Sequence, residues 1–144
     1  MTRSLRAVRR GRAHVEAMKY AIQLNSGPGQ NASAYTAYQF IKAALAEGHE
    51  IMRIFFYHDG VHHGFGPSRH TAAEVHAAPD WSLLARHHGI DLVLCVSAAT
   101  RRGLLPPEES RWAEANLAAG FRLGGLGQWM EACLQADRTL VFGG

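Results

Sequence analysis

The two cysteines, Cys95 and Cys133, are the side chains best suited to covalent chemistry. Cys95 lies near the end of an apolar run, DLVLCVS over 91–97, and a polar turn follows it. A thiol at the end of a strand can reach solvent, where its thiolate form is a nucleophile or a sulfur acceptor. The alternative interpretation is a small hydrophobe buried in a core strand, because free cysteine is among the most buried residue types. Cys133 lies beside Ala132 and Leu134 in a helical pattern, which predicts a packing role.

Cys95 and Arg101 enclose five residues, which is the spacing of cysteine-dependent tyrosine phosphatases. Such an enzyme needs a loop of backbone amides around the phosphate, a helix dipole that favours the thiolate, and a general acid. The enclosed residues, VSAAT, contain no glycine, and Gly103, Pro106 and Pro107 disfavour a regular helix that starts at Arg101. No general acid is evident. A phosphatase is therefore the weaker enzyme hypothesis.

Histidines and a glycine-containing turn are the other candidate binding features. Eight of the nine histidines fall between His49 and His88, and imidazole is a common metal ligand. No cysteine or carboxylate completes a recognised ligand spacing, so the sequence predicts no specific metal site. The turn at 26–29 follows an expected strand, but it lacks the glycine spacing of a dinucleotide site and the Gly-Lys-Ser/Thr ending of a phosphate loop. We interpret it as a structural turn.

Hydrophobic spacing predicts the elements that position these side chains. With 144 residues, of which 47% are hydrophobic, the chain is long enough for one domain with a core. Short apolar runs predict strands, and apolar residues three and four apart predict helices. The expected strands cover 19–26, 51–57, 91–97, 121–123 and 138–142, and the expected helices begin near 33, 81, 108 and 127. This alternation predicts an α/β fold, a single-domain three-layer sandwich with a mostly parallel sheet of about five strands flanked by helices.

Two further expectations concern packing. In the first helix, Tyr35, Tyr38, Ile41 and Leu45 recur along one stripe, which we expect to be buried against the sheet. The polar segment 58–70, rich in histidine and glycine, is expected to be a surface loop.

Positive charge is concentrated at the N-terminus. The chain has 15 Lys and Arg and 12 Asp and Glu. Five arginines and one acid, Glu16, fall within 1–17, which leaves ten basic and eleven acidic residues from Met18 onward. This nearly neutral remainder is not typical of a nucleic-acid binder. We therefore divide the chain into a basic extension at 1–17, disordered or upstream of the true start, and a domain at 18–144. An arm that binds RNA is the alternative.

The cellular compartment follows from what the sequence lacks. No apolar run is long enough to span a membrane, and no export signal is evident. Two cysteines are too few for a secreted disulfide scaffold. We expect a cytoplasmic protein with reduced thiols and no membrane contact.

Three segments together resemble the DsrE/TusD family of sulfur-relay proteins. They are AYTAYQFIKAALAEGHEIMRIFFYHDG over 34–60, DLVLCVSAATRRGL over 91–104, and 116–142, which contains GLGQWMEA. The likeness begins at Met18 and covers essentially the rest of the chain. In the family, the cysteine followed by V-x-A-A-x-R-R-G carries a persulfide, and Cys95 matches it. The loop after His62 departs from the family's usual Asn-rich sequence, and Cys133 replaces a small residue, so it inherits no function.

The resemblance implies a DsrE-like fold and a sulfurtransferase that accepts persulfide sulfur on Cys95 without a cofactor or a metal. It implies a heterohexamer, with two copies of each of three related DsrE-fold subunits. An upstream persulfide donor and a small sulfur-carrier protein are the implied partners, with no direct nucleic-acid contact. The implied pathway is 2-thiolation of tRNA wobble uridine, and the alternative is sulfur oxidation linked to dissimilatory sulfite reductase. Because some relatives in such complexes lack the cysteine, a non-catalytic assembly subunit is the non-enzymatic alternative.

Overall fold

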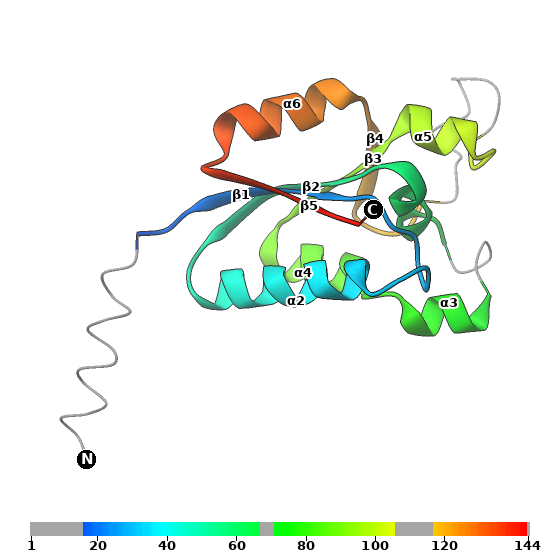
Figure 1. The fold of residues 1–144 in the computed structure, drawn as a ribbon, viewed down its shortest axis with the longest axis horizontal. Helices are drawn as coiled ribbons and strands as arrows, with labels where there is room; N and C mark the ends of the chain where they lie inside the picture. Colours follow the sequence, from blue (N-terminus) through cyan, green and yellow to red (C-terminus); the bar gives the residue numbers. More distant parts are fainter. Residues whose placement is uncertain (1–15, 67–70, 106–116, 144) are drawn as a thin grey trace, which may run out of the picture.

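The computed structural model describes residues 16–66, 71–105 and 117–143. The elements are β1 (Lys19–Leu24), α2 (Ser33–Ala46), β2 (Glu50–Phe56), the 3₁₀ helix η1 (His58–Gly64), α3 (Ala72–Ala77), α4 (Trp81–His88), β3 (Asp91–Cys95), α5 (Val96–Arg101), β4 (Phe121–Gly124), α6 (Leu126–Gln135) and β5 (Arg138–Phe142). Figure 1 shows three layers, with α2 and α4 on one face of the sheet and α6 on the other. Most of the helix expected from residue 108 lies outside the described residues. Within the described part of the chain, no helix has the length and apolar character needed to cross a bilayer.

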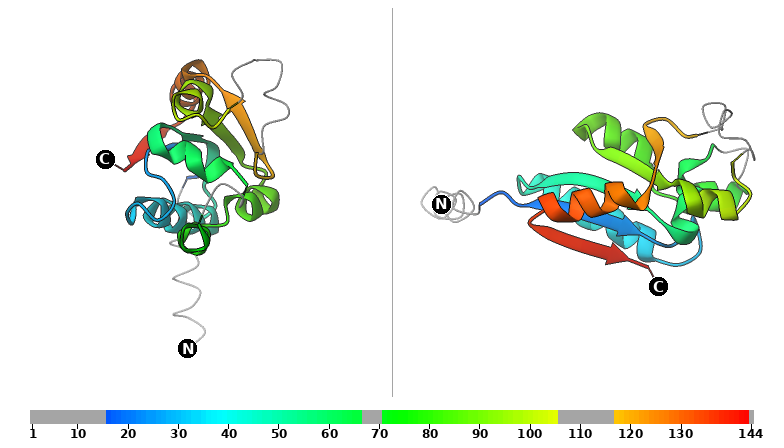
Figure 2. Two further views of the ribbon diagram at one scale, coloured as in Figure 1. Left: turned by 90° about the vertical axis from the view of Figure 1, so that its right-hand side faces the viewer. Right: turned by 90° about the horizontal axis from the view of Figure 1, so that it is seen from above.

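The strand order of the sheet is β4-β3-β2-β1-β5, and every strand pair is parallel. The chain steps in one direction from β1 to β4 and then crosses back to place β5 beside β1. Right-handed crossovers that run in opposite directions put their helices on opposite faces, and Figure 2 shows α6 on the face opposite α2. The predicted α/β sandwich with a five-stranded parallel sheet is confirmed. Because parallel strands end at one edge, the segments that follow β1, β2 and β3 gather there.

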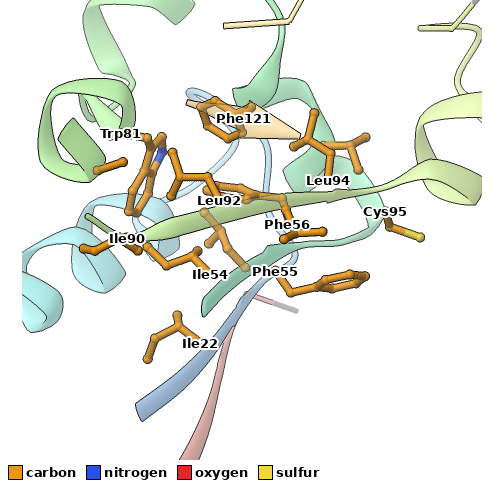
Figure 3. Packing of buried hydrophobic residues seen from close by; sticks show 14 of the residues in the cluster. Ile22, Ile54, Phe55, Phe56, Trp81, Ile90, Leu92, Leu94, Cys95 and Phe121 are labelled. Carbon is orange, nitrogen blue, oxygen red and sulfur yellow. The ribbon is translucent and has the colours of Figure 1, made fainter. Parts of the chain in front are cut away.

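The strand β3 is apolar because helices cover both faces of the sheet around it. On the α6 face, the ring of Phe55 stacks on Trp129 with centroids 6.0 Å apart. On the opposite face, Phe56 packs against Trp81 and Phe121 with centroids 5.4 and 5.0 Å apart. Figure 3 shows Phe55 pointing away from Trp81 and Phe121. This alternation fixes which layer each side chain of β2 and β3 joins.

The buried stripe of α2 differs from the expected one. Tyr35 is 58% exposed, and Tyr38 and Leu45 are only partly buried. The buried residues are Ala34, Ala37, Ile41 and Ala44. Small alanines bring the helix backbone close to the sheet, so the larger side chains lie at the rim of the contact. Tyr38 packs there edge-on against Trp81, with ring centroids 5.5 Å apart.

The segment expected to be a surface loop is partly buried, and this expectation is wrong for η1. Val61, His63 and Phe65 are buried because apolar residues alternate with the polar ones and anchor the turn to the core. The indole N–H of Trp81 donates to His63 Nδ1 at 3.2 Å. Since that nitrogen accepts, Nε2 carries the proton and donates to the Ser26 carbonyl at 3.0 Å. His63 is therefore a structural residue of the sheet edge.

A charge cluster connects β2, β3 and β4 at the end of the sheet remote from Cys95. The Asp91 carboxylate accepts hydrogen bonds from Arg53 Nε at 2.7 Å and from Arg122 Nε and Nη2 at 2.7 and 2.8 Å. The hydrogen bonds from Arg122 and then the one from Arg53 outweigh desolvation and lower the pKa of Asp91 below its ordinary value of 3.8. The ionised form of Asp91 therefore stabilises the fold.

Asp91→Asn is expected to lower the free energy of unfolding at neutral pH by about 1–2 kcal/mol. The folded-state pKa lies below the unfolded-state value, so this stabilisation is present above about pH 4 and is lost as the pH falls through the lowered pKa. Urea denaturation should show a difference in the free energy of unfolding between the variant and the parent chain, and this difference should become smaller in acid. Glu50→Gln, at an exposed carboxyl of the same sheet end, is the control. A difference in unfolding free energy that stays constant in acid would contradict the lowered pKa of Asp91.

Candidate functional site

Cys95 is the last residue of β3 and the N-cap residue of α5. The sequence predicted that the strand would continue to Ser97, but the helix begins at Val96. Ala98 and Ala99 favour helix and are almost fully buried. Gly103 follows the helix end with a left-handed φ of 67°. A short helix, and not the expected open turn, therefore follows the cysteine.

The side chain of Cys95 lies on the α6 face of the sheet. Residues two apart in a strand share a face, so Cys95 shares one with Asp91 and Val93. On this face Arg53, the register partner of Asp91, donates to the Gln128 carbonyl of α6 at 2.7 Å. Figure 3 shows the sulfur at the carboxyl end of β3, on the side opposite the Leu94 side chain.

The sulfur is covered in this single chain. Cys95 is 0% exposed and belongs to the main apolar cluster. Of the two interpretations of the sequence, the burial of Cys95 in the core holds in this chain, and the expectation that its thiol reaches solvent is wrong here. The strand end is followed by the helix α5 instead of an open turn. A hollow of about 310 Å³ borders the helix and is lined by Val96, Ser97, Thr100 and Arg101. A reagent or partner must therefore displace part of this cover to reach the sulfur.

Arg101 and Arg102 are neighbours in the sequence but differ in environment. Arg102 Nε donates to Asp59 Oδ1 at 2.8 Å, and its Nη1 donates to the Ala98 carbonyl at 3.1 Å. Gln30, in the turn after β1, donates to Asp59 Oδ2 at 2.9 Å. The hydrogen bond from Gln30 and then that from Arg102 lower the pKa of Asp59 below 3.8. This Asp59–Arg102 network joins the segments after β1, β2 and β3, whereas Arg101 is exposed and forms no ion pair within the described residues.

Arg102→Gln is expected to speed the labelling of Cys95 by a neutral aromatic disulfide about fivefold, because loss of the network loosens α5 from η1. The rate is measured in a Cys133→Ser background, which leaves Cys95 as the one thiol of the chain. Arg101→Gln removes the same charge from the neighbouring position and should leave the rate unchanged. Equal labelling rates in the two variants would show that the network does not restrain α5.

The structure gives little support for a metal site or a phosphatase at the carboxyl edge of the sheet. Among the described residues, no group of three His, Cys, Asp or Glu side chains is placed to hold a metal ion. The residues between Cys95 and Arg101 are helical, so amides beyond the first turn bond within α5 instead of surrounding a phosphate. This arrangement disfavours a phosphatase.

Two neighbours of Cys95, Gly124 and Gln128, were not identified from the sequence. Gly124 is the register partner of Cys95 on β4. The Gln128 Oε1 atom lies 3.0 Å from the position that a Cβ on Gly124 would occupy. Gln128 belongs to the GLGQWMEA stretch and Gly124 immediately precedes it, but only the pairing of β3 with β4 places them beside the cysteine. Cys133 is partly buried in α6, and its packing role stays a prediction.

Residues 18–142 match the DsrE/DsrF-like family. The chain belongs to this family. A putative sulfurtransferase DsrE from Allochromatium vinosum is 46% identical over 129 residues, which cover 88% of this chain and 99% of that protein. A sulfurtransferase TusD homolog from Pseudomonas aeruginosa is 45% identical over 130 residues, which cover 88% of this chain and 98% of that protein.

The DsrE/DsrF-like match includes β3, Cys95 and the whole of α6, and the resemblance seen in the sequence is confirmed. The crystal structure of the ychN protein from E. coli has the same fold, with a TM-score of 0.66. It is 19% identical in sequence, and the match covers 87% of this chain and 99% of that one.

Proposed function

We propose that this chain is a sulfurtransferase of a sulfur relay, which accepts persulfide sulfur on Cys95 and passes it to a small carrier protein. The observation that carries the proposal is the position of Cys95, at the carboxyl end of a central parallel strand. Relatives at 46% and 45% identity that are named sulfurtransferases support it. No cofactor takes part, because the exchange of sulfur between thiols needs only the thiolate and a persulfide.

The reaction is a pair of displacements at sulfur. The Cys95 thiolate attacks the outer sulfur of a donor persulfide, R–S–SH, and R–S⁻ leaves as the S–S bond of the donor breaks. The product is Cys95–S–SH, and the proton stays on the outer sulfur. The thiolate of the carrier then attacks this outer sulfur, and Cys95 leaves as a thiolate. Sulfur is transferred without net oxidation or reduction.

The covered sulfur makes access a second requirement of this mechanism. The elements over the carboxyl edge, η1 and α5, connect through the Asp59–Arg102 network, so we assign the opening of the site to partner contact at this edge. The partners we propose are two related DsrE-fold subunits in a heterohexamer, an upstream persulfide donor and the carrier, all in the cytoplasm. Nucleic acid is not a direct partner, because the residues from Met18 onward have almost no net charge.

For the pathway, we assign 2-thiolation of tRNA wobble uridine, the more widespread use of this architecture. Sulfur oxidation linked to dissimilatory sulfite reductase is the alternative, and relatives with TusD and DsrE names match this chain almost equally, at 45% and 46% identity. Deletion of the gene distinguishes the two. Loss of 2-thiouridine from tRNA supports the first assignment, and normal 2-thiouridine with impaired sulfur oxidation supports the second.

Mass spectrometry after incubation with a persulfide donor tests the proposed function. The chain should gain one sulfur atom, about 32 Da, on the peptide that contains Cys95, and reductant should remove it. Cys133→Ser is the matched control and should load normally. Added mass that follows Cys133, or no added mass on the chain within its complex, would overturn the proposal.

A further inference from the structure

The face of the sheet around Cys95 contains a buried acceptor without a partner. Gln128 Oε1 is inaccessible to solvent and accepts no hydrogen bond within the described residues. Buried polar groups are nearly always hydrogen-bonded, so an orphaned one calls for an explanation. The rest of the residue is anchored, because its backbone N–H donates to the Gly125 carbonyl at 3.0 Å and its carbonyl accepts from Arg53 at 2.7 Å.

The orphaned oxygen lies beside Cys95 because of strand register. Gly124 and Cys95 are paired across β4 and β3, and neighbouring strands lie about 4.8 Å apart. Gln128 Oε1 is 3.0 Å, and Gln128 Cδ 2.9 Å, from the place of a Cβ on Gly124. The Gln128 amide and Val93 Cγ1, which is 2.7 Å from the same Cβ position, therefore fill the space above Gly124, about one strand spacing from the cysteine.

The other side of Cys95 is aromatic. Tyr57 follows the last paired residue of β2 with an extended backbone, so it continues the row of Arg53 and Phe55 on the α6 face. Its ring centroid lies 6.1 Å from that of Phe55. On the β4 side, the side chain beside the strand pair is instead the polar amide of Gln128.

A persulfide extends the cysteine by one sulfur, with an S–S bond of about 2.05 Å. We infer that the outer sulfur of Cys95–S–SH points toward β4, beside the Gln128 amide, and donates its hydrogen to Gln128 Oε1. This inference rests on the proposed function. It makes Gln128 the residue that retains the loaded sulfur, and it gives the orphaned oxygen a donor that exists only after loading.

The bond also affects unloading. When a thiolate attacks the outer sulfur, the Sγ–S bond breaks and the sulfur leaves Gln128 together with its hydrogen. Removing the acceptor should therefore speed the unloading of the persulfide and leave the reactivity of the free thiol unchanged. A structural role for Gln128 would instead change both rates together.

The test uses a Cys133→Ser background and persulfide formed on Cys95 with a small inorganic polysulfide. Excess dithiothreitol removes the outer sulfur, and the rate is read by mass. Gln128→Met keeps the side-chain length but removes the amide, and should speed this step about tenfold. Labelling of the unloaded thiol by a neutral aromatic disulfide should stay within about twofold. Gln135→Met, the same change at an exposed position of α6, should alter neither rate.

A second variant addresses the geometry. Gly124→Ala places a methyl group against Val93 Cγ1 and the Gln128 amide. Displacement of the amide should reproduce the effect of Gln128→Met on unloading, and the double variant should add nothing further. An unchanged unloading rate in Gln128→Met, or an equal rise in unloading and thiol labelling, would overturn the inference. Because the persulfide is made chemically, this result is independent of whether a protein donor or carrier uses Cys95.

Discussion

Replacing Cys95 by alanine is expected to reduce sulfur transfer to the rate seen without the protein, a loss of about 1000-fold or more. The proposed mechanism passes each sulfur atom through Sγ, and no other side chain at the sheet edge can form the persulfide. Alanine is chosen because Cys95 is fully buried in an apolar cluster. Serine would add a buried hydroxyl and a cost of about 1–3 kcal/mol if it found no partner.

The measurement follows labelled sulfur from a donor persulfide to an acceptor thiol. Cys133→Ala is the matched control, since Cys133 is partly buried in α6 and should be dispensable. Urea denaturation of Cys95→Ala shows whether the variant is folded under assay conditions. Normal transfer by the folded Cys95→Ala variant within its complex would leave only the non-catalytic assembly role.

Replacing Gly60 by alanine is expected to produce the largest loss of stability among single methyl additions at the carboxyl edge, about 3 kcal/mol or more. A Cβ at this position would clash with the Leu24 carbonyl oxygen and lie 3.0 Å from its carbonyl carbon. That oxygen accepts a hydrogen bond from the Tyr57 N–H at 2.9 Å, so it cannot move without breaking the junction of β1 and η1. The backbone, and not a flexible side chain, opposes the methyl group.

Urea denaturation measures this effect, and Gly127→Ala is the matched control. Gly127 lies in α6 with nothing within 4 Å of an added Cβ, so the change should be neutral or stabilise by up to about 1 kcal/mol. A Gly60→Ala variant as stable as the parent chain would show that the contact between η1 and β1 is not as close as described.

The strands were predictable from the sequence because each is a short apolar run that ends at a recognised break. β5 (Arg138–Phe142) was predicted to the residue, and β3 differs only at its end. The connections were less predictable. η1 and α5 are too short for a periodic pattern, and their burial depends on what packs against them: Val61 and Phe65 enter the core, and Ala98 and Ala99 lie against it. The prediction of which residues of α2 are buried was wrong for a related reason. Alanine carries little weight in a hydrophobic pattern, but it permits the closest contact between a helix and a sheet.

The sequence identified Cys95 as the candidate sulfur acceptor, and the structure places it at the expected carboxyl edge of the sheet. Its burial was the alternative interpretation of the sequence, but the helix that follows it could not be predicted, because VSAATR is too short for a periodic pattern. Gln128 could not be identified from the sequence as a neighbour of Cys95. It is distant from Cys95 in the chain and becomes its neighbour only through the pairing of β3 with β4. The separate environments of Arg101 and Arg102 likewise depend on η1, which brings Asp59 to one of them.

The burial of Cys95 has a consequence for the resistance of its sulfur to oxidation. Peroxide and dioxygen convert an accessible sulfur through sulfenic to sulfinic and sulfonic acids, and the later steps cannot be reversed by thiols. Cys95 has 0% exposure, so its sulfur is shielded from these oxidants until a partner uncovers it. The same burial that slows sulfur transfer in the resting chain therefore protects the Cys95 thiol from irreversible oxidation between encounters with its partners.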